Sequence, residues 1–426
     1  MSVRARLLVV LLATLASACG KAKGAPASSG SSGPPGSIGS AGASGASGAA
    51  LADSVRPPGD RELPPTGGRI ALGNLDAQIR GAEAAIAKDP AEIDTRLKLV
   101  DLLSTRGMLL AKITDYERAL ALSEALVEGV KDAPGRPEVY LARASSRATL
   151  HLFDAALADL AEAEKRGAPP VRLLSPRAAI AEARGLLDEA WKLRRAAREQ
   201  QKNLQTLGAE AALLGQMRRF DEAERLFAQA EKSHRDVSPF PVAWLFFQEA
   251  TTWERAGKIE RARAYYAAAV ERLPGYAHAA MHLATLSPPD RAVDLLTPIV
   301  EVSDDPEIEL VLAQRLRMRG DVTGADQRLA HVRARFDALV AARPEAFAEH
   351  AGFFYLDEGH DSRRALALAK QNLALRKTEK AYELALLAAT AEGGGPELCA
   401  IGTEAQRLRY ASEMLRSIAA GACNPR

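Results

Sequence analysis

The sequence predicts an all-α protein in which antiparallel helix pairs stack into a solenoid. One observation is an alanine near the start of each expected second helix, at Ala156, Ala190, Ala223, Ala262, Ala292 and Ala325. Consecutive members of this series are 34, 33, 39, 30 and 33 residues apart. The other observation is a further alanine twelve residues before each of them, at Ala144, Ala178, Ala211, Ala250, Ala280 and Ala313. No segment shows the period-two alternation of a half-buried strand, so a helical repeat explains the pattern best.

Residues 243–274 show the repeat unit most clearly. Gly257 can take the left-handed conformation that ends a helix, so it closes the first helix of the unit. Ala262, Tyr266 and Ala269 form one stripe of the second helix, and Pro274 ends it. This unit resembles the tetratricopeptide repeat, a helix-turn-helix module of about 34 residues. The resemblance implies a right-handed α-solenoid whose concave groove holds a peptide, a helix or a partner protein.

The first nineteen residues form a separate signal. Arg4 and Arg6 precede an apolar run at residues 7–15, which is too short to span a bilayer. Small residues at 16–18 lead to Cys19, as at a cleavage site. The segment resembles a bacterial lipoprotein signal peptide, with Ala16 where the usual lipobox has Leu. The resemblance implies removal of residues 1–18 and acylation of Cys19, for example with palmitate. An ordinary secretory signal with an incidental cysteine is the alternative.

A tether and then the solenoid follow the signal. Residues 19–69 are rich in Gly, Ser, Ala and Pro and cannot bury enough apolar surface to fold, so we expect a disordered tether. Residues 70–420 are assigned to the solenoid. Gly20, rather than Asp, follows the cysteine, and by resemblance to sorted lipoproteins this favours an outer-membrane location facing the periplasm.

Individual helices are expected in order along the solenoid. The first three are predicted at 74–90, 92–107 and 115–130, with extra residues between the last two that lengthen one or both. Regular pairs should occupy residues 137–330, with an insertion at 233–241 and a shortened turn at 287–291. A long helix before Pro344, a pair at 346–360 and 362–377, a helix from residue 381 and a capping helix at 403–421 complete the prediction.

Charge and motifs exclude several function classes. Without Arg4 and Arg6 the 56 basic residues fall to 54, which equals the 54 acidic residues, so nothing favours binding to nucleic acid. The chain has no nucleophile elbow, phosphate loop or Cys-x-x-Cys motif. His278 and His282 share a helix face, but no third metal ligand is evident. We therefore expect no catalysis, cofactor, metal or small-molecule substrate.

Cys399 and Cys423 form a candidate disulfide. An oxidising envelope favours their pairing. A single helix over 397–420 would place them about 36 Å apart, so a bridge requires the chain to reverse, and residues 401–403 are the expected break. Both outcomes stay open at this point.

A candidate partner-binding surface lies on the helix that starts near residue 243. Phe246, Ala250 and Trp253 share one face and are expected in the core. Trp244, Phe247, Thr251 and Glu254 share a second face, which the resemblance places on the concave groove. Gln314, Arg317 and Tyr355 fall at equivalent positions of later repeats. The alternative is that residues 238–241 fold over Trp244 and bury it.

These observations lead to one functional hypothesis and one alternative. The hypothesis is a membrane-anchored scaffold lipoprotein that binds a protein or peptide in its groove and assists assembly of an envelope complex. The alternative is an envelope enzyme, or an obligate enzyme subunit, that uses its repeats to recognise a substrate.

Overall fold

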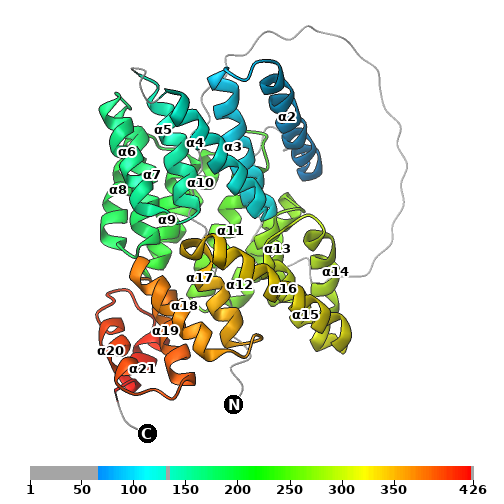
Figure 1. Ribbon diagram of the computed structural model, residues 1–426, viewed down its shortest axis with the longest axis vertical. Helices are drawn as coiled ribbons and strands as arrows, with labels where there is room; N and C mark the ends of the chain where they lie inside the picture. The colour runs from blue at the N-terminus through cyan, green and yellow to red at the C-terminus, as the bar shows by residue number, and fades with distance from the viewer. Residues whose placement is uncertain (1–65, 131–134, 424–426) are drawn as a thin grey trace.

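A computed structural model describes residues 66–130 and 135–423. The signal peptide, Cys19 and nearly all of the expected tether lie outside these residues. Within them the chain forms twenty α-helices and no strand, and consecutive helices pack as antiparallel pairs (Figure 1). The expected α-solenoid of helix pairs is therefore confirmed.

The helices follow one another with short turns. The first half of the solenoid consists of α2 (Gly68–Lys88), α3 (Ile93–Leu110), α4 (Ile113–Val130), α5 (Pro137–Thr149), α6 (Phe153–Lys165), α7 (Pro170–Ala183), α8 (Leu187–Gln200), α9 (Leu204–Gln216), α10 (Phe220–Ser233) and α11 (Phe240–Arg255). The second half consists of α12 (Ile259–Arg272), α13 (Ala277–Thr285), α14 (Pro289–Val300), α15 (Pro306–Arg319), α16 (Val322–Ala342), α17 (Pro344–Leu356), α18 (Ser362–Leu375), α19 (Glu379–Ala391), α20 (Pro396–Ala405) and α21 (Glu413–Gly421).

The repeating alanines hold the helix pairs together. All twelve alanines of the two series are at most 1% exposed. They lie on the first and second helices of six successive pairs, where a larger side chain would keep the helix axes apart. Between them pack the large side chains of the core, such as Phe153, Phe227 and Tyr266.

Three expected elements differ in detail. Helix α3 continues past Gly107 to Leu110, as the extra residues in this region indicated. The short step near residue 290 comes from a short helix α13 of 9 residues, because the turn after it is as long as the turn between α11 and α12. The predicted capping helix at 403–421 is wrong, since the chain leaves helix α20 after Ala405 and starts α21 at Glu413.

The solenoid winds tightly enough for one turn of the superhelix to contact the next. Ser303 Oγ donates a hydrogen bond to the carbonyl of Ala111, 192 residues earlier. His151 Nδ1 lies 3.0 Å from the carbonyl of Glu345, at a separation of 194 residues, and Arg218 Nε donates to the carbonyl of Tyr410 at a separation of 192 residues. One superhelical turn therefore takes about 190 residues, or roughly five and a half repeats of about 34 residues.

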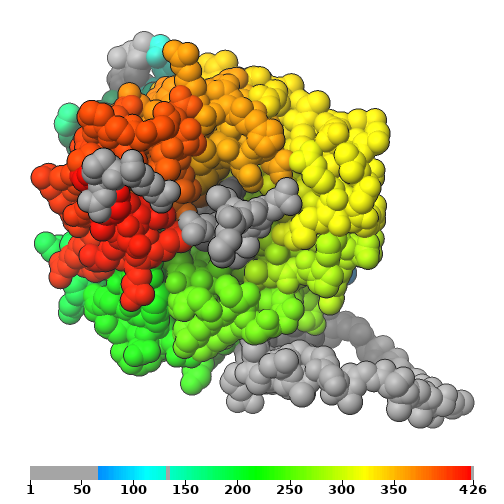
Figure 2. All heavy atoms as spheres, turned by 90° about the horizontal axis from the view of Figure 1, so that it is seen from below, coloured from blue at the N-terminus to red at the C-terminus, as the bar shows by residue number. Residues whose placement is uncertain are grey.

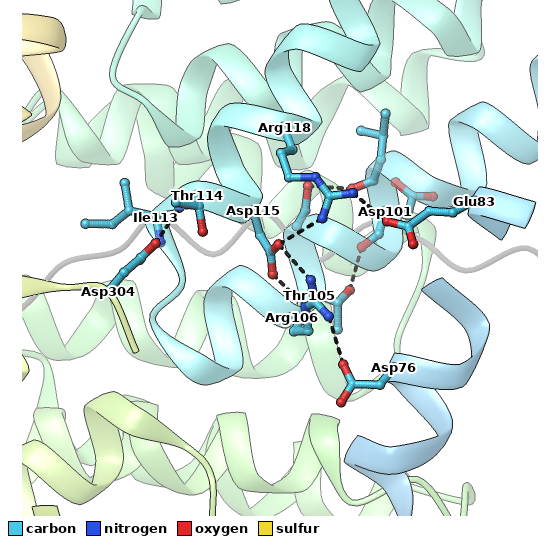
Figure 3. Close-up of polar contacts among 12 residues, drawn as sticks. Asp76, Glu83, Asp101, Thr105, Arg106, Ile113, Thr114, Asp115, Arg118 and Asp304 are labelled. Atoms are coloured by element: carbon cyan, nitrogen blue, oxygen red, sulfur yellow. Dashed lines mark hydrogen bonds and ion pairs between the residues drawn. The ribbon is translucent and has the colours of Figure 1, made fainter. Parts of the chain in front are cut away.

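The N-terminal helices contact both their neighbours in sequence and the next superhelical turn (Figure 3). Arg106 on α3 binds both carboxylate oxygens of Asp115 on α4, at 2.7 and 2.9 Å, and reaches Asp76 on α2 at 2.9 Å. Asp304, from the next superhelical turn, accepts hydrogen bonds from the backbone N–H groups of Ile113 and Thr114 at the start of α4. The start of α4 is thus capped by a residue far away in the sequence.

Candidate ligand cavity

The tight winding encloses a cavity on the axis of the superhelix. Its volume is about 1210 Å³, and its walls come from the α7–α8 turn, the ends of α9 and α11, the start of α12, α15, α17, α19 and residues 407–414. Seen from below, the middle and C-terminal segments of the chain surround a hollow at this place (Figure 2). The cavity therefore belongs to the assembled superhelix and to no single repeat.

Exposed apolar side chains gather at this cavity. Leu186 is 49% exposed, Ile259 37% and Met414 38%, and all three line the cavity. Leu186 lies in the α7–α8 turn, Ile259 is the first residue of α12, and Met414 is in the first turn of α21. Because large apolar side chains gain by leaving water, this cavity rim of Leu186, Ile259 and Met414 is suited to contact a ligand.

Charged side chains of both signs also line the cavity. The carboxylates are Glu182, Asp188, Glu189, Glu254, Asp357, Glu358, Glu379 and Glu383, and the lysines and arginines are Arg218, Arg255, Lys377, Lys380, Arg407 and Arg409. Several of them pair with each other: Arg218 lies 3.3 Å from Glu379, and Arg409 lies 3.2 Å from Asp188. With eight carboxylates and six cations, the lining carries no excess of positive charge.

Arg255 differs from these paired cations. It is the last residue of helix α11 and is only partly exposed. Within the described part of the chain, no carboxylate lies within ion-pair distance of its guanidinium group and no acceptor is hydrogen-bonded to it. Glu379, Glu254 and Glu182 act on it only from a distance, and each is already bound to other side chains. Burial lowers the pKa of Arg255 below its ordinary value, because the surrounding negative charges, Glu379 foremost, only partly offset the lost hydration.

A buried ionic cluster supports the wall formed by α17 and α19. Glu349 accepts hydrogen bonds from Arg376 and Asn372, and Lys380 lies 3.7 Å from it. Burial alone would raise the pKa of Glu349, but Arg376, Lys380 and His350 together hold it well below its ordinary value.

His350 faces both this cluster and the cavity, with Nδ1 2.7 Å from Glu307. Burial disfavours the charged imidazolium, but the Glu307 carboxylate raises the pKa of His350 above its ordinary value. Because all of these charges are paired, we interpret the cluster as a rigid support of the wall.

The predicted binding face on α11 is wrong for its aromatic residues. Trp244, Phe247 and Thr251 are all buried. The indole of Trp244 packs on Gly208 of α9, where a Cβ atom would lie 2.9 Å from the ring, so α9 covers it.

The ring of Phe247 packs among Tyr266, Tyr276 and His282, with centroid distances of 5.3 to 5.8 Å. The opposite face, Phe246, Ala250 and Trp253, is buried as expected. Helix α11 is therefore enclosed on both faces.

The other predicted surface residues divide between cavity, core and outer surface. Glu254 and Gln314 line the cavity, although the Glu254 carboxylate is buried and accepts a hydrogen bond from Tyr266. Tyr355 is fully buried and donates its hydroxyl to Asp337, so its assignment to the groove is also wrong. Arg317 is exposed and pairs with Asp326 at 2.7 Å and Glu358 at 2.6 Å, outside the cavity lining.

Cys399 and Cys423 are joined by a disulfide. The chain reverses between α20 and α21, at residues 406–412, and so brings the two Cα atoms to 4.3 Å. The expected break at 401–403 is wrong, because those residues continue helix α20. The bridge ties the C-terminal end of α21 back to α20, next to the segment that lines the cavity.

Residues 66–130 and 135–423 contain neither a metal-binding cluster nor a membrane-spanning helix. No group of three or more His, Cys, Asp or Glu side chains there could hold a metal ion. No helix of this part is long and apolar enough to cross a membrane.

Comparison with known proteins gives limited information. No family model matches the chain, and no curated protein is similar to it. A solved tetratricopeptide repeat protein from Parabacteroides merdae is 12% identical, with 74% of this chain and 98% of that protein covered and a TM-score of 0.35. The human IFIT1 dimer with PPP-AAAA is 13% identical, with 81% and 83% covered and a TM-score of 0.42. The same dimer with m7Gppp-AAAA is 12% identical, with the same coverage and a TM-score of 0.43. Such similarity says nothing about what this chain binds.

Sequence reasoning missed the residues that best define the cavity. Leu186 lies in a turn between paired helices, Ile259 is the first residue after such a turn, and Met414 lies in α21, within the range of the expected capping helix. An apolar residue in an exposed turn is a weak signal that could have identified the first two. Nothing in the sequence distinguishes Arg255 from other arginines at helix ends.

Proposed function

We propose that this protein is a scaffold that binds a peptide segment of a partner protein in its central cavity. The main support for this proposal is the cavity of about 1210 Å³ with its apolar rim. Small-molecule sites typically measure about 300 to 1,000 Å³, so this volume suits a segment of several residues. Paired charges around an apolar rim provide contacts for a chain that carries both polar and apolar groups.

The lining favours a polypeptide over a nucleic acid. A nucleic-acid backbone needs a surplus of Lys and Arg to replace its counterions, and eight carboxylates among the lining residues oppose that. We propose binding rather than catalysis as the role of these residues. The partner would be a component of an envelope complex whose assembly the scaffold assists.

We also propose that the solenoid is anchored to a membrane through Cys19, in a bacterial envelope and facing the periplasm. The support is the sequence alone: an apolar run followed by small residues and Cys19. A Cys19→Ser variant should leave the membrane fraction and take up no labelled palmitate. The wild type should stay in the membrane fraction and take up the label. A variant that stays membrane-bound, beside a wild type without label, would exclude the lipid anchor.

The cavity proposal is tested with apolar rim variants of the full chain. Ile259→Gln combined with Leu186→Gln removes apolar contact at two exposed positions, so the fold should remain intact. Retention of random-sequence peptides on the immobilised protein should fall about tenfold or more, since each lost contact contributes of the order of 1 kcal/mol.

Val322→Gln is the matched control for that experiment. Val322 is the first residue of α16, as Ile259 is of α12, and it is exposed but lies outside the cavity. The control should retain peptides like the wild type. Equal loss in the control and the rim variant, or no peptide retention by the wild type, would exclude the cavity as the binding site.

A further inference from the structure

Arg255 gives the cavity a more specific property. Its guanidinium group carries five N–H donors in a fixed planar fork, which matches the two oxygens of a carboxylate. Within the described residues none of these donors has a partner, although the side chain is partly buried and lines the cavity. Keeping a charge out of water without a partner is costly, so a ligand that supplies the partner would be bound preferentially.

The N–H donors of Arg255 are available to a ligand, because the nearby carboxylates are bound to other groups. The Glu379 carboxylate receives Arg218 at 3.3 Å and the backbone N–H of Ser412 at 2.9 Å. The Glu182 carboxylate receives Arg194 at 3.1 Å as well as Gln216. The C-terminal end of α11 offers Arg255 the partial negative charge of the helix dipole but no hydrogen bond. The Glu254 carboxylate accepts a hydrogen bond from Tyr266 and lies 3.3 Å from His282 Nδ1. All three nearby carboxylates are thus held in place away from Arg255.

Apolar contacts are available close to the same point. Ile259 lies four residues after Arg255, beyond the turn at Gly257, and is exposed on the cavity rim. Leu186 and Met414 complete the rim. A partly buried cation without a partner beside exposed apolar side chains matches a ligand that has an anionic group next to apolar side chains.

We propose that Arg255 is the anchor of the cavity and binds a carboxylate of the peptide segment, whose apolar side chains rest on Leu186, Ile259 and Met414. This inference rests on the proposed function and makes its ligand specific. The carboxylate can be the C-terminus of a chain or the side chain of Asp or Glu. Both present the same two oxygens to the guanidinium fork.

Peptide pools of equal length test the anchor and distinguish the two sources. The pools contain one fixed Asp or one fixed Asn among otherwise uncharged random positions, each with a free carboxylate or an amide at the C-terminus. The wild-type full chain should retain at least one acid pool about tenfold better than the Asn-amide pool, as one charge-assisted bidentate contact predicts. A preference that follows the fixed Asp identifies a side chain, and one that follows the free terminus identifies a chain end.

Variants of Arg255 test whether the preference for acid pools depends on its guanidinium group. Arg255→Gln should abolish it, while Arg255→Lys should keep part of it, because a lysine retains the charge without the fork. The melting temperature of Arg255→Gln should not fall, since the guanidinium has no partner to lose. Arg319→Gln is the matched control, because Arg319 ends helix α15 as Arg255 ends α11 but lies outside the cavity lining.

The outcomes separate the anchor from the binding site itself. Retention of peptides without any preference for acid pools would overturn the anchor and leave the peptide site in place. A preference that survives in Arg255→Gln would also overturn it. No retention of any pool, or retention of a uridine oligonucleotide in place of peptides, would overturn both proposals.

Discussion

At the scale of single residues, His151 shows how the fold selects a protonation state. It lies in the turn between α5 and α6 with a positive φ of 58°, a conformation that His and Asn tolerate better than most residues. It is buried against the next superhelical turn, where the neutral ring donates from Nδ1 to the Glu345 carbonyl, 3.0 Å away. Burial lowers the pKa of His151 to about 3, and the charges of Arg376 and His350 act in the same direction, against smaller opposing effects of the hydrogen bond to Glu345 and the charge of Glu349.

This shift predicts a loss of stability in mild acid. Because the pKa of His151 is below its ordinary value of 6.5, its contribution is complete above pH 6.5 and is lost as pH falls towards 3. The unfolded chain takes up the proton first. Between roughly pH 7 and pH 5.5 the free energy of unfolding should fall by about 1 kcal/mol through this group alone.

His151→Asn isolates the effect, because Asn accepts the backbone conformation and cannot titrate in this range. Urea unfolding of both proteins at the two pH values measures it. His350 and the carboxylates titrate in both proteins, so the difference between the two pH dependences belongs to His151. An identical change in the variant would show that His151 is not held neutral.

Residue patterns identified buried residues of the core but not which helix covers each face. The two alanine series were found because close helix contacts demand small side chains at a fixed spacing, and all twelve members are buried. Periodicity placed Trp244 and Phe247 on one face of their helix, and the resemblance to tetratricopeptide repeats assigned that face to the groove. Periodicity does not say what covers that face, and the contact of Trp244 with Gly208 depends on how α9 and α11 are set against each other.

At the scale of helices, the start of α4 depends on a distant loop. Asp304, which follows α14, accepts hydrogen bonds from the N–H groups of Ile113 and Thr114, the latter at 3.0 Å. The neighbouring Ser303 donates to the Ala111 carbonyl at 2.8 Å, so the same loop also satisfies the turn before α4. Helix α4 is thereby fixed to the next superhelical turn.

Removal of this cap should destabilise the N-terminal helices. Asp304→Ala should lower the free energy of unfolding by about 0.5 to 2 kcal/mol and speed amide hydrogen exchange at the start of α4. Asp304→Asn should restore part of the loss, because its amide oxygen still accepts. Asp294→Ala, at an exposed position of α14, is the control and should change neither quantity. Equal exchange rates at Ile113 in all four proteins would contradict the capping role.

Helix boundaries were predictable where their signals are local. Gly257 follows the first helix of the 243–274 unit as its sequence indicated, with a φ of 73°. The α20–α21 break was placed a few residues too early, because neither glycine nor proline marks residues 406–412. The cap of α4 was not predictable, since capping rules examine the residue just before a helix and Asp304 lies 191 residues away from Ile113.

At the scale of the whole molecule, contacts between superhelical turns create the cavity. Reasoning from neighbouring repeats predicted an open groove, because each repeat was expected to contact only the next. Small rotations between repeats accumulate over about 190 residues, and their sum decides whether two turns meet. The sequence period does not encode that sum, so the repeats were found and the central cavity was not.

The clearest contact between the turns joins Gly185 and Lys377. The backbone N–H of Lys377 donates to the Arg184 carbonyl at 3.1 Å, and both Gly185 and Lys377 line the cavity. A Cβ atom on Gly185 would lie 2.4 Å from the Lys377 carbonyl oxygen, a distance that only a shift of the backbone can relieve. Gly185→Ala should therefore separate the α7–α8 turn from the α18–α19 turn and open the wall of the cavity.

Gly257→Ala supplies the comparison that makes this test specific. Gly185 and Gly257 both have positive φ angles, 86° and 73°, in turns between paired helices, so alanine should cost each of them about 1 to 2 kcal/mol of backbone strain. Only Gly185 has a neighbour in the way, because nothing lies within 4 Å of a Cβ atom on Gly257. Small-angle scattering should give a larger radius of gyration for Gly185→Ala alone, and hydrogen exchange at Lys377 should be faster in that variant alone. If both variants stay as compact as the wild type, this contact does not keep the cavity closed, and the other inter-turn bonds at Ala111, His151 and Arg218 must be sufficient.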